Sequence, residues 1–281
     1  MALVFKTDNA ASYLQGLFDT PTDDTSVGYL YGWGDNTKGQ LGNGTSSATY
    51  ISEPVKISNT KWKQITTCGY GDILALNEDG IMYAWGSGGV PEFMVNENGT
   101  PANVVETFKI CNTKWKTIFN GGDWKCALTE DNKLYSWGYC PTYLFNNGTS
   151  PYINHPVQWE NTTYKVAAPC DTSLLTIDSS GDMYGCGMKS SSILGFELTE
   201  NQATPIKLNN SKWKYVTCVN ALALAIDEND HLYVWGKNSK KNISDSLPTT
   251  HIQYTPLRIG TSTWKHVYIS NDEIVYGIRS E

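Results

Sequence analysis

The sequence predicts an all-β fold, a β-propeller of five four-stranded blades of about 50 residues each, and three observations carry this prediction. Short aromatic strands of the form Leu/Met-Tyr-x-Trp-Gly recur along the chain. A second tryptophan position recurs with the same period. The first and last repeat units are incomplete in complementary ways, so that pairing of the N-terminal strand with the C-terminal strand would complete the ring.

The period is defined by two independent landmarks. The first is the tryptophan of LYGWG, MYAWG, LYSWG, MYGCG and LYVWG, and its positions are Trp33, Trp85, Trp137, Cys186 and Trp235. The second lies in an earlier strand, and its positions are Trp62, Trp115, Tyr164, Trp213 and Trp264. Both series advance in steps of 49 to 53 residues. A shared period of this length indicates a repeat architecture.

Each unit has the same order of elements. It begins with paired short strands such as PVKISNTKWKQI, residues 54–65. A small apolar strand follows and ends in acidic, Asn and Gly residues that favour a hairpin turn, as in LALNEDG at 74–80. The aromatic strand comes next. Four short strands in about 50 residues are typical of a propeller blade.

The two chain ends predict how the ring closes. Residues 266–281 stop where the turn and aromatic strand of the last unit should come, and residues 27–34 form an aromatic strand with no strands before it. We therefore expect residues 274–280 to pair with residues 28–34, so that one of five blades is built from both ends of the chain. Such closure removes exposed strand edges.

The repeated tryptophans are predicted to be structural. A blade must bury both faces against its neighbours, and an indole supplies a large apolar surface for this purpose. Burying roughly 200 Å² contributes on the order of 5 kcal/mol as an upper bound. At Cys186 the smaller side chain predicts a looser blade, or one filled by its neighbour. The residues assigned to this role are Trp33, Trp62, Trp85, Trp115, Trp137, Trp213, Trp235 and Trp264.

Composition and charge exclude several classes of function. The net charge of -7 argues against a nucleic-acid partner, because such domains usually carry a basic face. No long apolar run or N-terminal signal pattern is present, which predicts no membrane contact and a cytoplasmic or virion location. Seven cysteines without a CxxC pair favour reduced, mostly buried thiols over disulfides. The four histidines share no repeat position, so we expect no metal, no cofactor and no enzymatic activity.

The strings LYGWGDNTKGQLGNGT at 30–45 and MYGCGMKSSSILGF at 183–196 resemble repeats of the regulator of chromosome condensation family. The resemblance covers about residues 27–281 and implies a β-propeller, most often of seven blades in this family. The founding member resembles an exchange factor for a small GTPase and a chromatin binder, and its activity depends on insertions that are missing here. Similar repeats in bacteriophage proteins look like attachment modules, and the lysine-rich basic composition favours a phage origin.

A protein-interaction or structural module without catalytic activity, for example in a phage virion, is the function the sequence favours. The alternatives are an exchange-factor-like regulator of a small GTPase, a carbohydrate-binding lectin with a glycan partner, and an enzyme with a site at the mouth of the ring. Loops at one face of the ring supply the candidate partner-binding residues, which are Tyr70, Asp72, Asp123, Trp124, Asp171, Asn220, Asp272 and Glu273. Converging carboxylates there would attract a basic partner, although Asp and Asn also cap turns.

Residues 1–26 lie outside the repeats and are expected to form a tail, distinct from the propeller domain at 27–281. The segment NAASYLQGLF, residues 9–18, predicts two or three turns of helix with an apolar side. Such a tail would either anchor the propeller to a larger assembly or cover the face of one blade.

Overall fold

The fold is described from a computed structural model, which describes residues 3–7, 27–37, 39–46, 50–67, 72–86, 105–139, 152–170, 172–188, 190, 192–195, 200–270 and 272–280. The chain divides into two compact units. The first comprises residues 1–131, 135–139 and 152–158, and the second comprises residues 132–134, 140–151 and 159–281. The helix predicted at 9–18 lies outside the described residues, and the division into a tail and a propeller domain stays a prediction.

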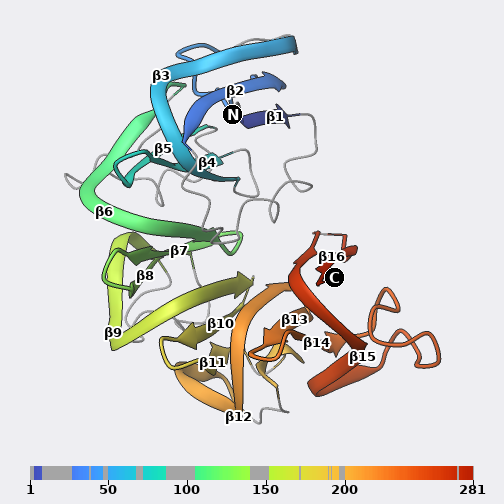
Figure 1. Cartoon of the computed structure of the whole chain (residues 1–281). Coiled ribbons are helices and arrows are strands. Elements are labelled where there is room, and N and C mark those ends of the chain that lie inside the picture. The colour runs from blue at the N-terminus through green and yellow to red at the C-terminus, as the bar shows by residue number, and fades with distance from the viewer. Residues whose placement is uncertain are drawn as a thin grey trace. The chain divides into compact units, whose positions relative to one another are not determined.

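The first unit contains β1 to β7 and parts of β8 and β9 (Figure 1). The strand bounds are β1 (Leu3–Thr7), β2 (Gly28–Gly34), β3 (Ile51–Thr67), β4 (Asp72–Asn77), β5 (Ile81–Gly86), β6 (Phe108–Asn120), β7 (Trp124–Thr129), β8 (Lys133–Tyr139) and β9 (Tyr152–Cys170).

The second unit contains the rest of β8 and β9 and all later elements, and these later elements form the yellow to red part of Figure 1. Their bounds are β10 (Ser173–Asp178), β11 (Asp182–Gly187), the 3-10 turn η2 (Ser192–Leu194), β12 (Gln202–Val219), β13 (Leu222–Asp227), β14 (His231–Lys237), β15 (Ile252–Ile269) and β16 (Val275–Arg279). The expected all-β class is confirmed. The part of the chain that the structure describes contains no helix with the length and apolar character needed to span a bilayer.

Every long strand takes part in two sheets. In β12, residues 202–212 pair with β11, and residues 213–219 pair with β13. In β3, residues 51–62 pair with β2 and residues 62–67 with β4. The end of one long strand, two short strands and the start of the next long strand therefore make one four-stranded antiparallel module. This is the repeating unit that the sequence predicted, although the count of five blades stays a prediction.

The predicted closure of the ring is wrong for this structure. The outer edge of β2 pairs in parallel with β1, from Leu3 opposite Leu30 to Thr7 opposite Gly34. The strand order runs from β1 to β16, and in the described residues β16 pairs with β15 alone. Because β1 already satisfies the backbone groups along the outer edge of β2, that edge is not available to the C-terminal strand.

Three of the landmark tryptophans pack against tyrosines of the aromatic strands. Each of three indoles meets the tyrosine of its aromatic strand edge to face, with ring centroids 5.1 to 5.2 Å apart; the pairs are Trp62–Tyr83, Trp115–Tyr135 and Trp213–Tyr233. This geometry is favoured by the quadrupoles of the rings. Six of the eight structural tryptophans are at most 3% exposed. Trp33 and Trp264, in the first and last strand pairs of the repeat, are only half-buried.

The aromatic-strand tryptophans also tie one module to the loop before it. The indole N–H of Trp85 donates to the carbonyl oxygen of Gln40 at 2.9 Å, and that of Trp235 donates to the carbonyl oxygen of Ile193 at 2.6 Å. A Cβ at Gly42, where φ is +66°, would lie 2.5 Å from the Trp85 ring, so this close approach requires glycine. At Cys186, which is buried, the loop that follows supplies fully buried Ile193 and Leu194 to the core around Trp213 and Trp235.

The hairpin turns follow the predicted chemistry. One oxygen of the Asp227 carboxylate accepts the backbone N–H groups of Asn229 and His231 at 2.9 and 2.8 Å. Asn77 and Asp178 hold the corresponding turns in the same way. Side-chain oxygens that satisfy turn amides stabilise these tight connections.

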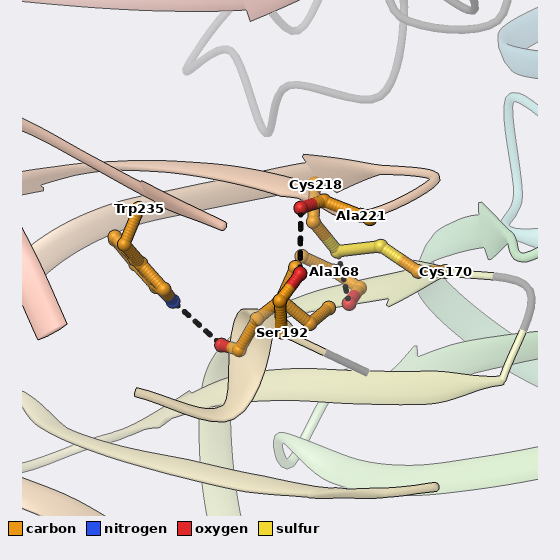
Figure 2. Close-up of a disulfide and its surroundings, with 7 residues drawn as sticks. Ala168, Cys170, Ser192, Cys218, Ala221 and Trp235 are labelled. Carbon is orange, nitrogen blue, oxygen red and sulfur yellow. Dashed lines mark hydrogen bonds between the residues drawn. A yellow bond between two sulfur atoms is a disulfide. The ribbon is translucent and has the colours of Figure 1, made fainter. Parts of the chain in front are cut away.

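The prediction of reduced thiols is wrong for one pair, because a disulfide joins Cys170 to Cys218 (Figure 2). The two residues lie near the ends of β9 and β12, and their Cα atoms are 6.1 Å apart, within bonding range. Their separation of 48 residues is close to one repeat period, so the fold places them side by side. Cys126 and Cys186 are buried and take part in no disulfide, whereas Cys111 is part-buried.

Trp235→Ala should destabilise the chain by about 3–5 kcal/mol, because it removes a fully buried indole and its hydrogen bond. Trp33→Ala, at the same repeat position but half-buried, is the matched control and should cost about half as much or less. Urea unfolding measures both. Equal losses would contradict the packing role assigned to burial at this position.

Asp182→Asn tests an ion cluster on the surface of the second unit. The Asp182 carboxylate lies 2.8 Å from Lys212 Nζ and 3.1 Å from Lys207 Nζ. The hydrogen bond from Lys212, and then that from Lys207, lowers the pKa of Asp182. The ion cluster therefore stabilises the folded chain fully above the pKa of about 3.9 that an unfolded Asp has. This stabilisation is lost as the pH falls through the lower pKa of folded Asp182.

In chemical denaturation, Asp182→Asn should accordingly be less stable than the wild type at pH 7, and this difference should vanish in strong acid. Asp245→Asn, at an exposed loop carboxylate, should show no such dependence. A stability difference for Asp182→Asn that is independent of pH would rule out the ion cluster as its cause.

Candidate functional site

Three loops of the second unit meet around Glu273, and we define them as the loop end of this unit. They connect β12 to β13, β14 to β15 and β15 to β16. The Glu273 carboxylate accepts a hydrogen bond from Ser239 Oγ at 2.5 Å, and Asn220 Nδ2 approaches it at 3.4 Å. The Glu273 carbonyl oxygen accepts one from Asn242 Nδ2 at 2.8 Å. All three loops are thereby joined at one residue.

Glu273 occupies an unusual position for a glutamate. Its side chain is buried, and its backbone has a φ of +61°, in the left-handed region that non-glycine residues rarely adopt. Asn220 has a φ of +49°. Buried carboxylates require hydrogen-bond donors, and strained backbone persists only where surrounding contacts hold it. The contacts from Ser239 and Asn242 meet both requirements.

The long loop after β14 is organised by Asn238, which is fully buried. Its Nδ2 donates to the carbonyl oxygens of Ser244 and Leu247 at 2.9 and 3.1 Å, and its Oδ1 accepts the backbone N–H of Ile243 at 3.0 Å. In the first unit Asn36 does the same, since its Oδ1 accepts the N–H of Leu41 at 2.9 Å. Both follow a Trp-Gly pair by two residues. An asparagine two residues after Trp-Gly is therefore a sequence signal for an ordered loop, and the sequence prediction did not include it.

The predicted partner-binding residues do not all come together. Asn220, Asp272 and Glu273 meet at the loop end of the second unit, where Asp272 is exposed. In the first unit Asp123 is exposed, whereas Trp124 is 1% exposed at the start of β7. Asp72 begins β4 and is described only by its backbone pairing with Gly86. Tyr70 and Asp171 lie outside the described residues.

The loop end carries both signs of charge. Exposed Lys237, Lys240 and Lys241 lie in the same segment as exposed Asp245, close in sequence to the Ser239 that binds Glu273. The Ser192 hydroxyl donates to the Ala221 carbonyl oxygen at 3.0 Å, which attaches η2 to the loop that carries Asn220 (Figure 2). A surface of this kind suits a polar protein partner better than a purely basic one.

No metal site is formed by the described residues at this end. In the described residues no group of three or more His, Cys, Asp or Glu side chains is arranged to hold a metal ion. A cavity of about 200 Å³ lies in the first unit, where Cys111, Trp115, Tyr135 and His155 are among the lining residues. The Cys111 sulfur accepts the Trp115 indole N–H at 3.3 Å, which supports the core.

Comparisons with known proteins identify relatives that carry the same kind of repeat. Residues 27–76 match the family model of the Regulator of chromosome condensation (RCC1) repeat. The guanine nucleotide exchange factor SRM1 of Saccharomyces cerevisiae is 27% identical over 254 residues, 75% of this chain and 49% of that protein. Protein RCC1 of Candida albicans is 32% identical over 161 residues, 48% of this chain and 33% of that protein. These matches support the similarity of the repeats in this chain to those of the regulator of chromosome condensation family.

A solved structure supports the fold. Prp20p from Saccharomyces cerevisiae, whose binding to Gsp1p and histones was studied, superposes with a TM-score of 0.68 and 21% identity. The match covers 90% of this chain and 65% of that chain. At this identity the likeness shows a shared β-propeller-type fold. The chain spans about half or less of the length of the two curated relatives.

Two expectations change with these matches. The yeast proteins do not support a bacteriophage origin or a virion role. The prediction of a chain without catalytic activity is wrong, because the relatives include a guanine nucleotide exchange factor, a class that promotes nucleotide exchange. A protein partner remains supported, since related proteins bind other proteins.

Asn238→Ala should release the loop from residue 238 to residue 251. The variant leaves the amide of Ile243 and the carbonyls of Ser244 and Leu247 without this partner, at a cost of about 1–3 kcal/mol. Hydrogen exchange should speed up across the loop, while Thr249→Ala, at an exposed position in the same loop, should leave exchange unchanged. Unchanged protection in Asn238→Ala would show that Asn238 does not organise the loop.

Proposed function

We propose that the chain binds a small GTPase and promotes guanine nucleotide exchange on it. The observation that carries this proposal is the similarity to the exchange factor SRM1 over 75% of the chain, together with a fold shared with Prp20p. The acidic sequence, with a net charge of -7, is compatible with a protein partner that presents basic groups.

An exchange factor works by differential affinity. It must bind the nucleotide-free GTPase more tightly than the nucleotide-bound form, and by thermodynamic reciprocity it then weakens nucleotide binding by the same factor. The loop end of the second unit fits this task, since its loops are cross-linked through Glu273 before any partner arrives. Ordering costs on binding are correspondingly small.

The residues divide into two roles under this proposal. Asp123 and Asp272 have exposed side chains and would contact basic groups of the GTPase. Asn220 and Glu273 hold the loops and act as positioning residues. Tyr70, Asp72, Asp171 and Trp124 are the other contact residues that the sequence predicts. Of these, Trp124 is buried, so it gives no support to a glycan-stacking alternative.

The release of a fluorescent guanine nucleotide from a panel of small GTPases tests the activity. We expect the chain to accelerate release from at least one of them. Asp123→Lys and Asp272→Lys should each reduce the acceleration about tenfold, as expected for about 1.4 kcal/mol of lost charge contact. Glu228→Lys makes the same charge change in the turn between β13 and β14 and should leave the rate intact.

Two outcomes would count against the proposal. No acceleration with any GTPase would refute exchange activity. Equal affinity for nucleotide-free and nucleotide-bound GTPase would leave a protein-interaction module without exchange activity, which is the second candidate function and is supported by the protein partners of related chains.

A further inference from the structure

The disulfide between Cys170 and Cys218 joins two strands that the sheet keeps apart. In the strand order, β10 and β11 lie between β9, which ends at Cys170, and β12, which carries Cys218. The ends of these two strands pair with β10 and β13 instead, so that Cys170 lies opposite Ser173 and Cys218 opposite Ala223. The disulfide is therefore a covalent link between two consecutive modules, and both modules belong to the second unit.

Cys218 lies next to the loop end of the second unit. Asn220 follows it by two residues, with a backbone φ of +49° and its Nδ2 atom 3.4 Å from the Glu273 carboxylate. The carbonyl oxygen of Ala221 then accepts the Ser192 hydroxyl at 3.0 Å (Figure 2). The turn from β12 to β13 is thus held on both sides of Asn220, by the disulfide before it and by the Ser192 contact after it.

The surroundings of the two sulfur atoms suit both oxidation states. Cys170 is buried, whereas Cys218 is half-buried, so an external thiolate can reach the Cys218 sulfur. The same sulfur lies 3.2 Å from the carbonyl oxygen of Ala168. A reduced Cys218 thiol would therefore find a hydrogen-bond acceptor already in place.

A different contact links consecutive modules in the first unit. There the side chain of Gln64, in β3, bonds to β6. Its Oε1 accepts the Thr117 hydroxyl at 3.0 Å and the Ile118 backbone N–H at 2.9 Å, and its Nε2 donates to the Ile118 carbonyl oxygen at 2.7 Å. Thiols do not alter an amide contact of this kind, so only the link in the second unit responds to redox conditions.

We propose that Cys170 and Cys218 form a reversible redox switch that sets the order of the loop end. With the disulfide formed, Asn220 is held in contact with Glu273, and the surface offered to a protein partner is preorganised. With both thiols reduced, the turn from β12 to β13 gains conformational freedom, and a partner must order it on binding. The effect on a partner rests on the proposed function, whereas the effect on the loop does not.

A small thiol such as glutathione is the co-reactant of the switch. Its thiolate attacks the Cys218 sulfur, which forms a mixed disulfide and releases the Cys170 thiolate. A second glutathione thiolate attacks the glutathione sulfur of that mixed disulfide, which yields oxidised glutathione and the Cys218 thiolate. Both protein thiolates take up the two protons that the two glutathione thiols gave up. The reverse sequence, with oxidised glutathione as the oxidant, forms the disulfide again.

Hydrogen exchange of the full chain in glutathione buffers, from fully reduced to fully oxidised, tests the effect on the loop. Alkylation and peptide mapping should show Cys170 and Cys218 changing state together, while Cys111 joins no disulfide between protein residues. Reduction should speed up amide exchange at residues 219–222 about tenfold, because the turn opens locally more often. Exchange at Ile118, beside the Gln64 contact, should not change.

Two sets of variants serve as comparisons. The double variant Cys170→Ser, Cys218→Ser should exchange as the reduced wild type does at every glutathione ratio. Cys111→Ser, at a part-buried cysteine outside the disulfide, should keep the full response. Circular dichroism confirms folding, and the reduced wild type gives the same comparison without a substitution. A pair that stays in one oxidation state at every ratio would overturn the proposal, as would equal loop exchange in both states.

The release of guanine nucleotide separates the switch from the proposed function. If both hold, reduction of the wild type should lower the acceleration of release on the order of tenfold, and the double serine variant should be slow in either buffer. No acceleration in either state would refute the exchange activity, while a loop response in the same samples would still support the switch. Equal acceleration in both states would overturn the control of partner binding by the disulfide.

Discussion

The hydrogen bond from an aromatic-strand indole to a loop carbonyl, with the ring packed behind it, is the interaction on which the repeat depends. Trp85 reaches Gln40, and Trp235 reaches Ile193. Each bond joins an aromatic strand to the loop that follows the previous aromatic strand. A four-stranded module alone would leave both faces exposed, so its stability comes from neighbours joined in this way. This explains why tryptophan recurs at the position, since only this side chain combines a large apolar surface with a single N–H donor.

The repeat pattern in the sequence predicted the strands, the turns and the buried tryptophans. It did not predict the pairing of the strands at the two ends of the chain. The period located the strands, the turns and the buried indoles because each is fixed by local chemistry repeated along the chain. Closure failed because β1, outside the repeats, pairs with β2. The Cys170–Cys218 disulfide matches no metal or redox spacing motif, because the two cysteines are 48 residues apart and only the stacking of repeats brings them together. Glu273 was proposed as a contact residue, but its burial and left-handed backbone make it a positioning residue.

The main property of the candidate site is that hydrogen bonds hold its loops in place, and no single reactive group dominates it. Glu273 connects loops from three strand pairs through hydrogen bonds, Asn238 folds one of these loops, and exposed charges of both signs lie nearby. Such a preorganised polar surface favours recognition of another protein, which agrees with the exchange-factor relatives.

Hydrogen exchange of the assigned indole N–H groups of Trp85 and Trp235 tests the central interaction most directly. If these bonds hold consecutive modules together, both protons should exchange only through global unfolding, with the same free energy as the backbone amides of β4 and β13. Exchange that is orders of magnitude faster than that of those amides would show that the modules separate locally, and would contradict the role given to the indoles.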